Sequence, residues 1–546
     1  MKSIYKINKK YFFIIIFLIS IVKVQHDIKY ITGNMPYPQH VDEYHVVING
    51  INMINNNNLY PGILVYPSLP IYICSSIIYC SNFIENLFKS NSTLDKLDNL
   101  NYPFFKEYIP ILSAKLFVYF LSILTMFLIS LVALKLSNCY ISSITCFILT
   151  AFSQLFIYQS RDYINIDLFA TFFVTVNIFY FVYFFHNNIS NFTLILAGFL
   201  TGLAISSKYP HGLIILMYIS SITFFNHGSF LKKLLNSLII LITSILTMFF
   251  CCPYIFIFFE KWLSEIVRQR QIYKNGWPGY TVDAGLTHFF LQIKQLFLEF
   301  GGFAFILFIA GIFFLIKYKR KISIPILVYF FIFIFYFSNH SINFARNLLP
   351  QYILYALFAS FGFSFLIKYF SKFIHSSIIL FVLLCLTCIT FPYENAKRIF
   401  ISANETRNVL HEFINTSLPK GVKIFISKEI GLDISELDDY NISEINFLNE
   451  DKKTLNSAVA KIANSKDIFV YPVFCTDMRW PDGIHFANSI NQSINGLKSL
   501  LYIQGRVGGS HSYIHLSRPG AQVNSSPTSP WGNPSIIVSK GLKVSL

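Results

Sequence analysis

Long apolar runs recur through most of this 546-residue sequence and constrain its fold more than any other feature. From Tyr11 to about Phe391 they approach or exceed the roughly 20 residues with which a helix crosses a hydrocarbon core of about 30 Å. The composition agrees, since 54% of the residues are hydrophobic, only 13% are charged and the mean hydropathy is +0.53. Soluble globular chains are far more polar. The sequence therefore predicts a polytopic α-helical membrane protein.

We expect about eleven transmembrane helices. Their approximate bounds are 11–24, 113–134, 139–157, 168–185, 194–207, 211–225, 236–256, 301–316, 323–338, 350–367 and 375–391. The apolar segment 63–84 is interpreted as a membrane-surface helix broken by Pro67 and Pro70, because counting it as a crossing would put two basic loops on the wrong side. The first segment is interpreted as an uncleaved anchor, since no small-x-small cleavage site follows it.

The net charge of +16 is concentrated in short connections between apolar runs. The basic residues cluster at Lys2, Lys6, Lys9 and Lys10, at Lys232 and Lys233, at Lys317, Lys319, Arg320 and Lys321, and at Lys368 and Lys372. This pattern follows the positive-inside rule. It predicts a multi-pass protein of the cell inner (plasma) membrane with a cytoplasmic N-terminus and a periplasmic or extracellular C-terminal tail. Nucleic acid is not an expected partner, because no basic face or base-stacking module accompanies the charge.

The chain divides into two predicted domains. Residues 1–392 form a transmembrane domain with a first outer loop at 25–112, and residues 393–546 form a small exoplasmic α/β domain. In the second part, "GVKIFIS" and "KDIFVYPV" are strand candidates, and "ENAKRIFISANETRNVLHEFINTSL" and "TLNSAVAKIANS" have helical periodicity. The Gly-, Ser- and Pro-rich stretch 505–535 is predicted to be a loop.

Cysteine and histidine give little support for a metal site. Eight of the nine cysteines lie in or beside apolar segments, which is typical of packed helix residues, so neither a disulfide framework nor a zinc site is predicted. His40 and His45 lie five residues apart, which is not a standard zinc spacing.

A set of polar residues falls on the predicted outer side. The residues are His40, Asp42, Glu43 and His45 after the first span; Arg161, Asp162 and Asp167 before the fourth; Lys208, Tyr209 and His211 between the fifth and sixth; and His340, Arg346 and Asn347 before the tenth. Ionisable groups at membrane depth are costly, so they are usually paired, face a cavity or take part in function.

These residue types predict a transfer reaction. Asp42 is the candidate general base, because an ionised carboxylate can accept a proton from a hydroxyl. Lys208 and Arg346 are cations suited to holding a phosphate oxyanion. Together they predict hydroxyl attack on one face of a substrate while a phosphate leaves from the other.

Each candidate also has a plainer explanation. Adjacent acids in a loop are often merely solvated, Asp167 suits the start of a helix, and Lys208 and Arg346 could extend to the headgroups. The presence of acids and bases from four separate segments on one side favours function.

Five motifs, taken in order, carry a resemblance to a known family. They are "HVDEYHVVINGINM", "YPGILVYPSLPIYI", "SRDYINIDLFATFF", "GFLTGLAISSKYPHGLIIL" and "FARNLLPQYILYALFA". The chain resembles the GT-C glycosyltransferases that use lipid-phosphate sugars, specifically the family of protein O-mannosyltransferases and bacterial lipid A aminoarabinose transferases. The layout is similar to that of the bacterial members.

The resemblance implies a GT-C fold and an inverting glycosyltransferase. It would transfer a sugar from a polyprenyl-phosphate donor, reached through membrane lipid, to a hydroxyl on a glycan, lipid or protein acceptor. The implied site residues are Asp42 as base with Glu43 supporting it, Asp167 as a second acid with Asp162 as a competing choice, Lys208 and Arg346 on the donor phosphate, and Tyr209 and His211 in the substrate-binding set.

Two questions stay open at this point. The stretch "VYPSLP" lacks the nearby Glu and Lys of the aminoarabinose transferases, so the resemblance leaves the cofactor unknown and a divalent metal ion undecided. The alternative function is a transporter or lipid flippase with a charged outward cavity. Transporters commonly show internal inverted repeats and a site at the midplane, whereas here no repeat is evident and the polar groups gather at one face.

Overall fold

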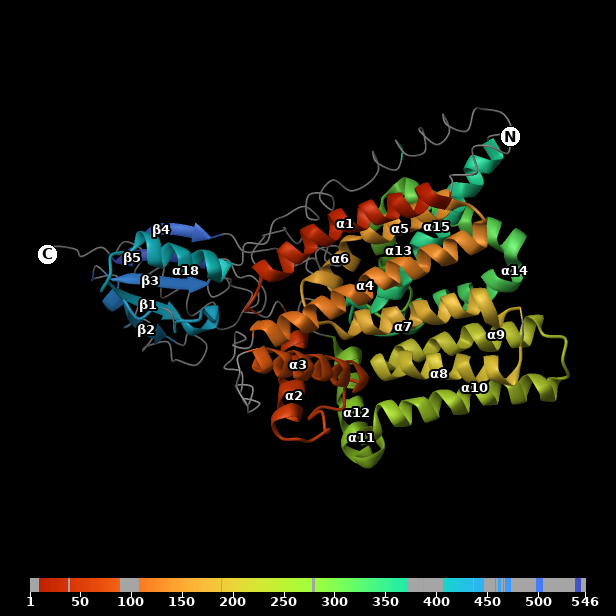
Figure 1. Ribbon diagram of the computed structural model, residues 1–546, viewed down its shortest axis with the longest axis horizontal. Helices are drawn as coiled ribbons and strands as arrows, with labels where there is room; N and C mark the ends of the chain where they lie inside the picture. Colours follow the sequence, from red (N-terminus) through yellow and green to blue (C-terminus); the bar gives the residue numbers. More distant parts are fainter. Residues whose placement is uncertain are drawn as a thin grey trace.

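A computed structural model describes the protein as a helical bundle and a smaller sheet domain (Figure 1). The described residues are 9–37, 40–88, 108–187, 189–276, 280–370, 386, 406–435, 437–445, 457, 460–462, 465, 467–472, 497–503 and 536–541. The helical bundle lies within residues 9–370, and the sheet domain is built from segments between 406 and 541.

The helices of the bundle follow one another through short connections. In chain order they are α1 (Lys9–Gly33), α2 (Val41–Asn55), α3 (Leu69–Phe88), α4 (Tyr108–Ser137), α5 (Tyr140–Ala151), α6 (Gln154–Arg161), α7 (Ile166–Tyr180), η1 (Phe181–Phe185), α8 (Asn191–Ser207), η2 (Tyr209–Ile214), α9 (Ile215–Phe225), α10 (Phe230–Cys251), α11 (Pro253–Ile257), α12 (Phe259–Asn275), α13 (Leu286–Phe300), α14 (Gly302–Ser338), η3 (Ala345–Leu348) and α15 (Leu349–Phe370).

Several of these helices can span a membrane. Among the described residues, five helical stretches are long and apolar enough: α4, α7 with η1, α10, α14, and η3 with α15; the bent pair α5 and α6 would add a sixth. The multi-pass helical class is therefore confirmed. The number eleven stays a prediction, because nearly all of the segment 375–391 lies outside the described residues.

Two sequence predictions need correction. The span predicted at 139–157 is bent by 63° between α5 and α6, where the Ser153 hydroxyl accepts a hydrogen bond from the Phe156 amide and begins a new helix. Pro67 and Pro70 do not break a helix over 63–84. Pro67 precedes α3 and Pro70 lies in its first turn, where a missing N–H group costs no helical hydrogen bond.

The helix α14 contains two segments joined by a sharp bend. Lys319 has non-helical dihedral angles (φ −134°, ψ 35°), and the Ser323 hydroxyl donates to the Leu315 carbonyl at 3.1 Å. Eight residues of straight helix would separate these groups by about 12 Å. The chain therefore turns at Lys319, in agreement with separate predicted segments at 301–316 and 323–338.

Glycines allow two helix pairs to pack closely. A Cβ atom on Gly202 of α8 would lie 2.7 Å from the Ser244 carbonyl oxygen of α10, and one on Gly311 of α14 would lie 1.8 Å from the Phe358 carbonyl oxygen of α15. Small residues let helix backbones approach where lipid supplies no hydrophobic drive for association. These contacts fix α8 and α15, which carry the candidate site at one end.

The C-terminal domain is a five-stranded mixed sheet with the helix α18 (Thr406–Ser417). The strands β1 (Lys423–Ser427), β2 (Asn441–Ile445), β3 (Ile468–Pro472), β4 (Leu497–Ile503) and β5 (Ile536–Gly541) lie in the order β2-β1-β3-β5-β4. β1 is parallel to β2 and β3, while β5 is antiparallel to β3 and β4. The predicted strands "GVKIFIS" and "KDIFVYPV" are confirmed as β1 and β3. The predicted loop at 505–535 and most of "TLNSAVAKIANS" lie outside the described residues.

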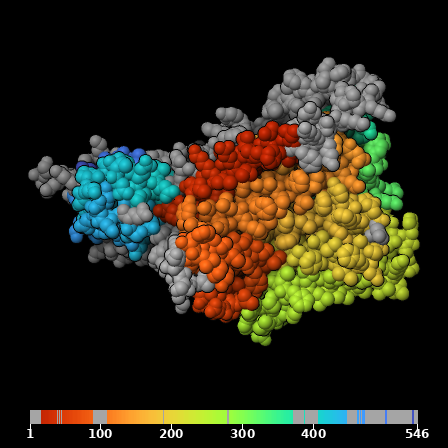
Figure 2. All heavy atoms as spheres, in the orientation of Figure 1, coloured from red at the N-terminus to blue at the C-terminus, as the bar shows by residue number. Residues whose placement is uncertain are grey.

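The sheet domain contacts the turn that follows α1. The Asn408 side chain donates to the carbonyls of Gly33 (3.3 Å) and Met35 (3.2 Å), and the Arg407 guanidinium lies 4.1 Å from the ring centre of Tyr37. The domain forms a lobe at one end of the bundle (Figure 2). The start of α10 and the bend of α14 lie at the opposite end (Figure 1).

Candidate functional site

Four separate segments bring their charged side chains together at the end of the bundle near the sheet domain. Asp42 lies in the first turn of α2, Asp167 in the first turn of α7, Lys208 between α8 and η2, and Arg346 in η3. We call these four residues the Arg346 cluster.

Local capping places the two acids. The amide of Asp42 donates to Nδ1 of the N-cap residue His40 (3.0 Å), and the amide of Asp167 donates to Oδ1 of the N-cap residue Asn165 (2.8 Å). Carboxylates are stabilised in the first turn of a helix by the unpaired amides and the helix dipole. The sequence thus fixes where each acid stands on its helix.

Arg346 joins the two acids. Its Nη2 lies 3.1 Å from Oδ2 of Asp42, and its Nε lies 3.6 Å from Oδ2 of Asp167. Lys208 pairs with the other oxygen of Asp167 and also donates to Oδ1 of Asn347 (2.7 Å). Two carboxylates therefore face two cations.

Aromatic side chains surround the Arg346 cluster. The Tyr66 hydroxyl donates to Asp42 Oδ1 (3.4 Å), the Tyr273 hydroxyl accepts from the Asn347 amide (3.3 Å), and Tyr163 stacks on His40 with ring centres 4.5 Å apart. His40 in turn contacts Nη1 of Arg346 through Nε2 (2.9 Å). Sequence reasoning missed these tyrosines, because nothing distinguishes them among the 33 tyrosines of the chain.

The environment keeps Asp42 ionised. Burial disfavours its charge, but the positive fields of Arg346, His40 and Lys208 outweigh burial and hold the pKa of Asp42 below its ordinary value. At neutral pH the carboxylate can accept hydrogen bonds and protons, as a general base must.

Glu43 and Asp162 lie apart from the Arg346 cluster. The fully buried Glu43 carboxylate contacts Nζ of Lys115 in α4 (2.9 Å) and accepts from the Ile164 amide (3.2 Å). These contacts anchor the first turn of α2 next to Asp42.

Asp162 belongs to a second ionic group, which we call the Asp27 cluster: Lys23, Asp27, Tyr119, Arg161 and Asp162. Asp27 Oδ1 lies 3.1 Å from Nη1 of Arg161, its Oδ2 accepts from the Tyr119 hydroxyl at 2.9 Å, and Nε of Arg161 lies 3.5 Å from Asp162. Burial raises the pKa of Asp162 to about 7 despite Arg161.

The remaining predicted residues have other contacts. The Tyr209 hydroxyl donates to the Leu64 carbonyl (2.8 Å) and accepts from the Trp262 indole (3.1 Å), so it joins the 56–68 connection to α12. His211 is fully buried one turn beyond Lys208. His45 is exposed on α2, and His340 Nδ1 contacts the Tyr336 carbonyl in the last turn of α14 (2.9 Å).

The acids do not combine into a metal site within the described ranges. No group of three or more His, Cys, Asp or Glu side chains there is arranged to hold a metal ion. Asp42 and Asp167 are instead balanced by Arg346 and Lys208.

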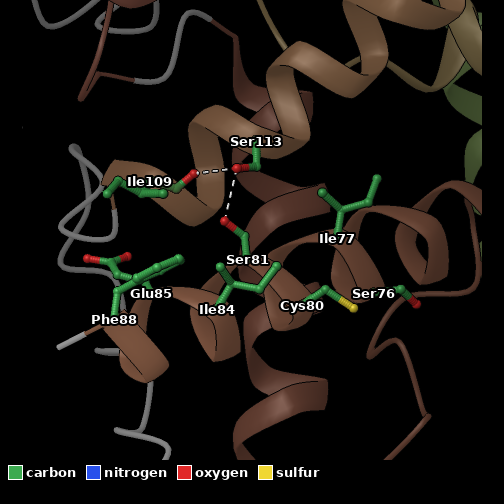
Figure 3. A pocket seen from close by; sticks show the side chains of 9 residues that line it. All are labelled: Ser76, Ile77, Cys80, Ser81, Ile84, Glu85, Phe88, Ile109 and Ser113. Carbon is green, nitrogen blue, oxygen red and sulfur yellow. Dashed lines mark hydrogen bonds between the residues drawn. The ribbon is translucent and has the colours of Figure 1, made fainter. Parts of the chain in front are cut away.

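A separate apolar hollow lies between α3 and α4 (Figure 3). Its volume is about 640 Å³, and its walls include Ile77, Ile84, Phe88 and Ile109, with Ser81 and Ser113 hydrogen-bonded to each other at 2.9 Å. None of its lining residues belongs to the Arg346 cluster. Its chemistry suits hydrocarbon rather than a charged reacting group.

Part of the chain matches a known protein family. Residues 82–265 match the family model of dolichyl-phosphate-mannose-protein mannosyltransferases. The segment contains Asp167 and Lys208, whereas Asp42 and Arg346 lie outside it. No curated protein sequence matches the chain.

Solved structures share the architecture. The oligosaccharyltransferase of Archaeoglobus fulgidus in its apo form has 10% identity and a TM-score of 0.50, covering 91% of this chain and 73% of its own. ArnT from Cupriavidus metallidurans in the apo state has 8% identity and a TM-score of 0.45, covering 96% of this chain and 97% of its own. The match over residues 82–265 and the fold shared with the archaeal enzyme relate the chain to membrane glycosyltransferases. The match favours the enzyme over the transporter alternative.

Proposed function

We propose that the protein transfers a sugar from a polyprenyl-phosphate-linked donor to a hydroxyl acceptor, with inversion at the anomeric carbon and Asp42 as general base. The observation that supports this most strongly is the Arg346 cluster, in which two acids and two cations from four segments meet. The lipid-phosphate donor follows the name of the matching family. The acceptor is a hydroxyl group of a glycan, lipid or protein.

The bond changes balance without a general acid. The acceptor oxygen forms a bond to the anomeric carbon as the bond from that carbon to the phosphate oxygen breaks, and the acceptor proton passes to Asp42. The polyprenyl phosphate leaves with the electron pair. Lys208 and Arg346 stabilise the negative charge that develops on it, which is where electrostatic catalysis has its largest effect.

Arg346 links donor binding to the strength of the base. Without substrate its guanidinium is bound to Asp42, which lowers the proton affinity of that carboxylate. A donor phosphate attracts the same guanidinium through a forked pair of hydrogen bonds. Asp42 then loses part of its counter-charge and becomes a stronger base only when the donor is in place.

We place the reaction on the exoplasmic side. The basic residues Lys232 and Lys319 occur at the end of the bundle opposite the sheet domain, and the positive-inside rule assigns that end to the cytoplasm. Single cysteines test this in a cysteine-free background: Asn57→Cys, in the connection between α2 and α3, should react with a membrane-impermeant maleimide in intact cells, and Lys319→Cys should not. The reverse labelling pattern would contradict the placement of the reaction on the exoplasmic side.

The decisive test of activity uses purified protein and a panel of polyprenyl-phosphate sugars. At least one donor should be consumed with release of polyprenyl phosphate, and the Asp42→Asn variant should consume none. Folded wild-type protein that consumes no member of a broad panel, or a fully active Asp42→Asn variant, contradicts the proposal.

A further inference from the structure

Three buried polar side chains lie directly beneath the Arg346 cluster. His211 follows Lys208 by one turn, and its amide donates to the Lys208 carbonyl at 3.0 Å. Gln351 follows Asn347 by one turn at the start of α15. Lys208 and Asn347 are hydrogen-bonded to each other, so the segments that follow them start side by side. The next turn of each segment, with His211 and Gln351, lies further into the bundle.

Both residues face the second segment of α14. The His211 ring lies 5.2 Å from the Phe333 ring, which is 5.6 Å from the Tyr329 ring one turn earlier on the same helix. The Tyr329 hydroxyl in turn interacts with Gln351. His211, Tyr329 and Gln351 are each 0% exposed.

Apart from the contact between Tyr329 and Gln351, the hydrogen-bonding capacity of these residues is unused. Within the part of the chain that the structure describes, neither ring nitrogen of His211, neither polar atom of the Gln351 amide, nor the Tyr329 hydroxyl has a partner of normal hydrogen-bond geometry. Buried polar groups in native proteins are nearly always hydrogen-bonded to protein or to ordered water. Buried polar atoms on these facing segments therefore indicate an occupant.

We propose that His211, Tyr329 and Gln351 form an inner polar pocket that binds hydroxyl groups. An imidazole, a phenol and an amide each offer both donors and acceptors, as a hydroxyl does. The three side chains carry no permanent charge, and the nearest cation, Lys208, is already paired with Asp167, so the pocket suits an uncharged ligand rather than a phosphate. The hydroxyl belongs to resident water or to the sugar of the donor; the second source rests on the proposed function.

Conservative substitutions test whether the pocket is occupied. If it is dry, Tyr329→Phe and Gln351→Leu remove unsatisfied polar atoms and raise the Tm of the full-length protein. If it holds a hydroxyl ligand, the Tm falls in both variants, on the order of 2 °C or more, and it falls further in the double variant than in either single one, because more is lost than the contact between Tyr329 and Gln351. Tyr218→Phe is the matched control, because the Tyr218 hydroxyl donates to Asn177 Oδ1 at 3.0 Å. The fall in Tm of this variant shows what the loss of a satisfied tyrosine hydroxyl costs.

Two ligands distinguish resident water from the donor sugar without requiring turnover. The thermal shift of the protein is measured with polyprenyl phosphate and with a polyprenyl-phosphate sugar. If the sugar enters the pocket, it adds stabilisation in the wild type that Gln351→Leu lacks. If only water occupies the pocket, the added stabilisation is the same in both proteins while the Tm of the unliganded variants still falls. If the Tm rises in both Tyr329→Phe and Gln351→Leu, the pocket holds no hydroxyl ligand and the proposal is wrong. If neither lipid shifts the Tm, the result contradicts the proposed donor rather than the pocket.

Discussion

The Arg346 cluster and the Asp27 cluster contain the same residue types and differ in what surrounds them. Among the cations, Arg346 is 17% and Lys208 13% exposed, whereas Arg161 is 5% and Lys23 11% exposed, so the clusters differ chiefly at the arginine. The first cluster is drawn from helix starts and connections, while the second links the middle of α1 to α4 and to the end of α6.

Buried charged residues alone therefore do not indicate a reactive site. In the Asp27 cluster, Asp27 is satisfied by Lys23, Tyr119 and Arg161 inside the bundle, so a substrate would have to displace internal packing. In the Arg346 cluster the cations are reachable and lie next to an ionised acid. We therefore propose that the chemistry takes place at the Arg346 cluster and that the Asp27 cluster holds α1 in the bundle.

Removing the proposed base should have the largest effect on activity. Asp42→Asn keeps the size of the side chain but cannot take the acceptor proton, so sugar transfer should fall by about 10²–10⁴-fold, the usual contribution of a general base. The measurement is single-turnover transfer at saturating donor, with abundance and donor binding near wild type. Unchanged transfer would remove Asp42 from this role.

The corresponding change in the Asp27 cluster should affect stability instead. Asp27→Asn leaves Lys23 without its buried counter-charge and leaves Arg161 with Asp162 alone, and losing one partner of a buried pair costs roughly 3–5 kcal/mol. Unfolding in detergent should show this loss, while transfer per folded molecule keeps the wild-type rate constant. A specific loss of the rate constant at normal stability would give this cluster a catalytic role.

The cations should control donor use. Lys208→Ala and Arg346→Ala each remove charge-assisted hydrogen bonds of about 1.5–3 kcal/mol, so the donor KM should rise roughly 10–100-fold. Lys232→Ala, at the other end of the bundle, is the control for a general change of charge. Donor dependence equal to that of the wild type would mean that these side chains only balance the charges of Asp42 and Asp167.

Arg346→Ala should also shift the pH profile. Arg346 holds the pKa of Asp42 below its ordinary value, so without Arg346 that pKa rises. Because only the ionised form accepts a proton, activity as the pH falls should be lost at a higher pH in the variant than in the wild type. The profile of kcat/KM for the free enzyme reports this shift. If activity is lost at the same pH in the variant and in the wild type, Arg346 does not control the pKa of Asp42.

The smallest expected effect concerns Asp162, the acid that competes with Asp167 in the sequence. Its pKa is raised to about 7 in the folded protein, against about 3.9 when unfolded. The folded state therefore binds more protons between these values, and this carboxyl destabilises the protein as the pH rises.

Asp162→Asn should remove that penalty. Relative to the wild type, the stability of the variant should increase by about 1.4 kcal/mol from pH 6 to pH 8. Denaturant unfolding at both pH values measures it, and sugar transfer should persist, unlike in Asp167→Asn. A stability difference that is the same at both pH values would contradict the raised pKa.

Sequence reasoning reached the members of the Arg346 cluster but not their pairing. Asp42, Asp167, Lys208 and Arg346 interrupt apolar sequence, and such interruptions stand out without a structure. It did not separate Asp162 from Asp167, which lie five residues apart, because the turn between α6 and α7 sends them to different clusters. Lys115 and Asp27 were missed because each lies inside an apolar helix, where a single charge reads as an ordinary helix residue.

The sequence by itself determined that the chain is a multi-pass helical membrane protein, and it determined where several helices begin. Both properties depend on local composition and on neighbouring residues, such as His40 before Asp42 and Asn165 before Asp167. Only the tertiary structure decided which charges meet. His40 and Arg346 touch across 306 residues of sequence, and that contact depends on how glycine-lined helices pack and where α14 turns, neither of which any local stretch encodes.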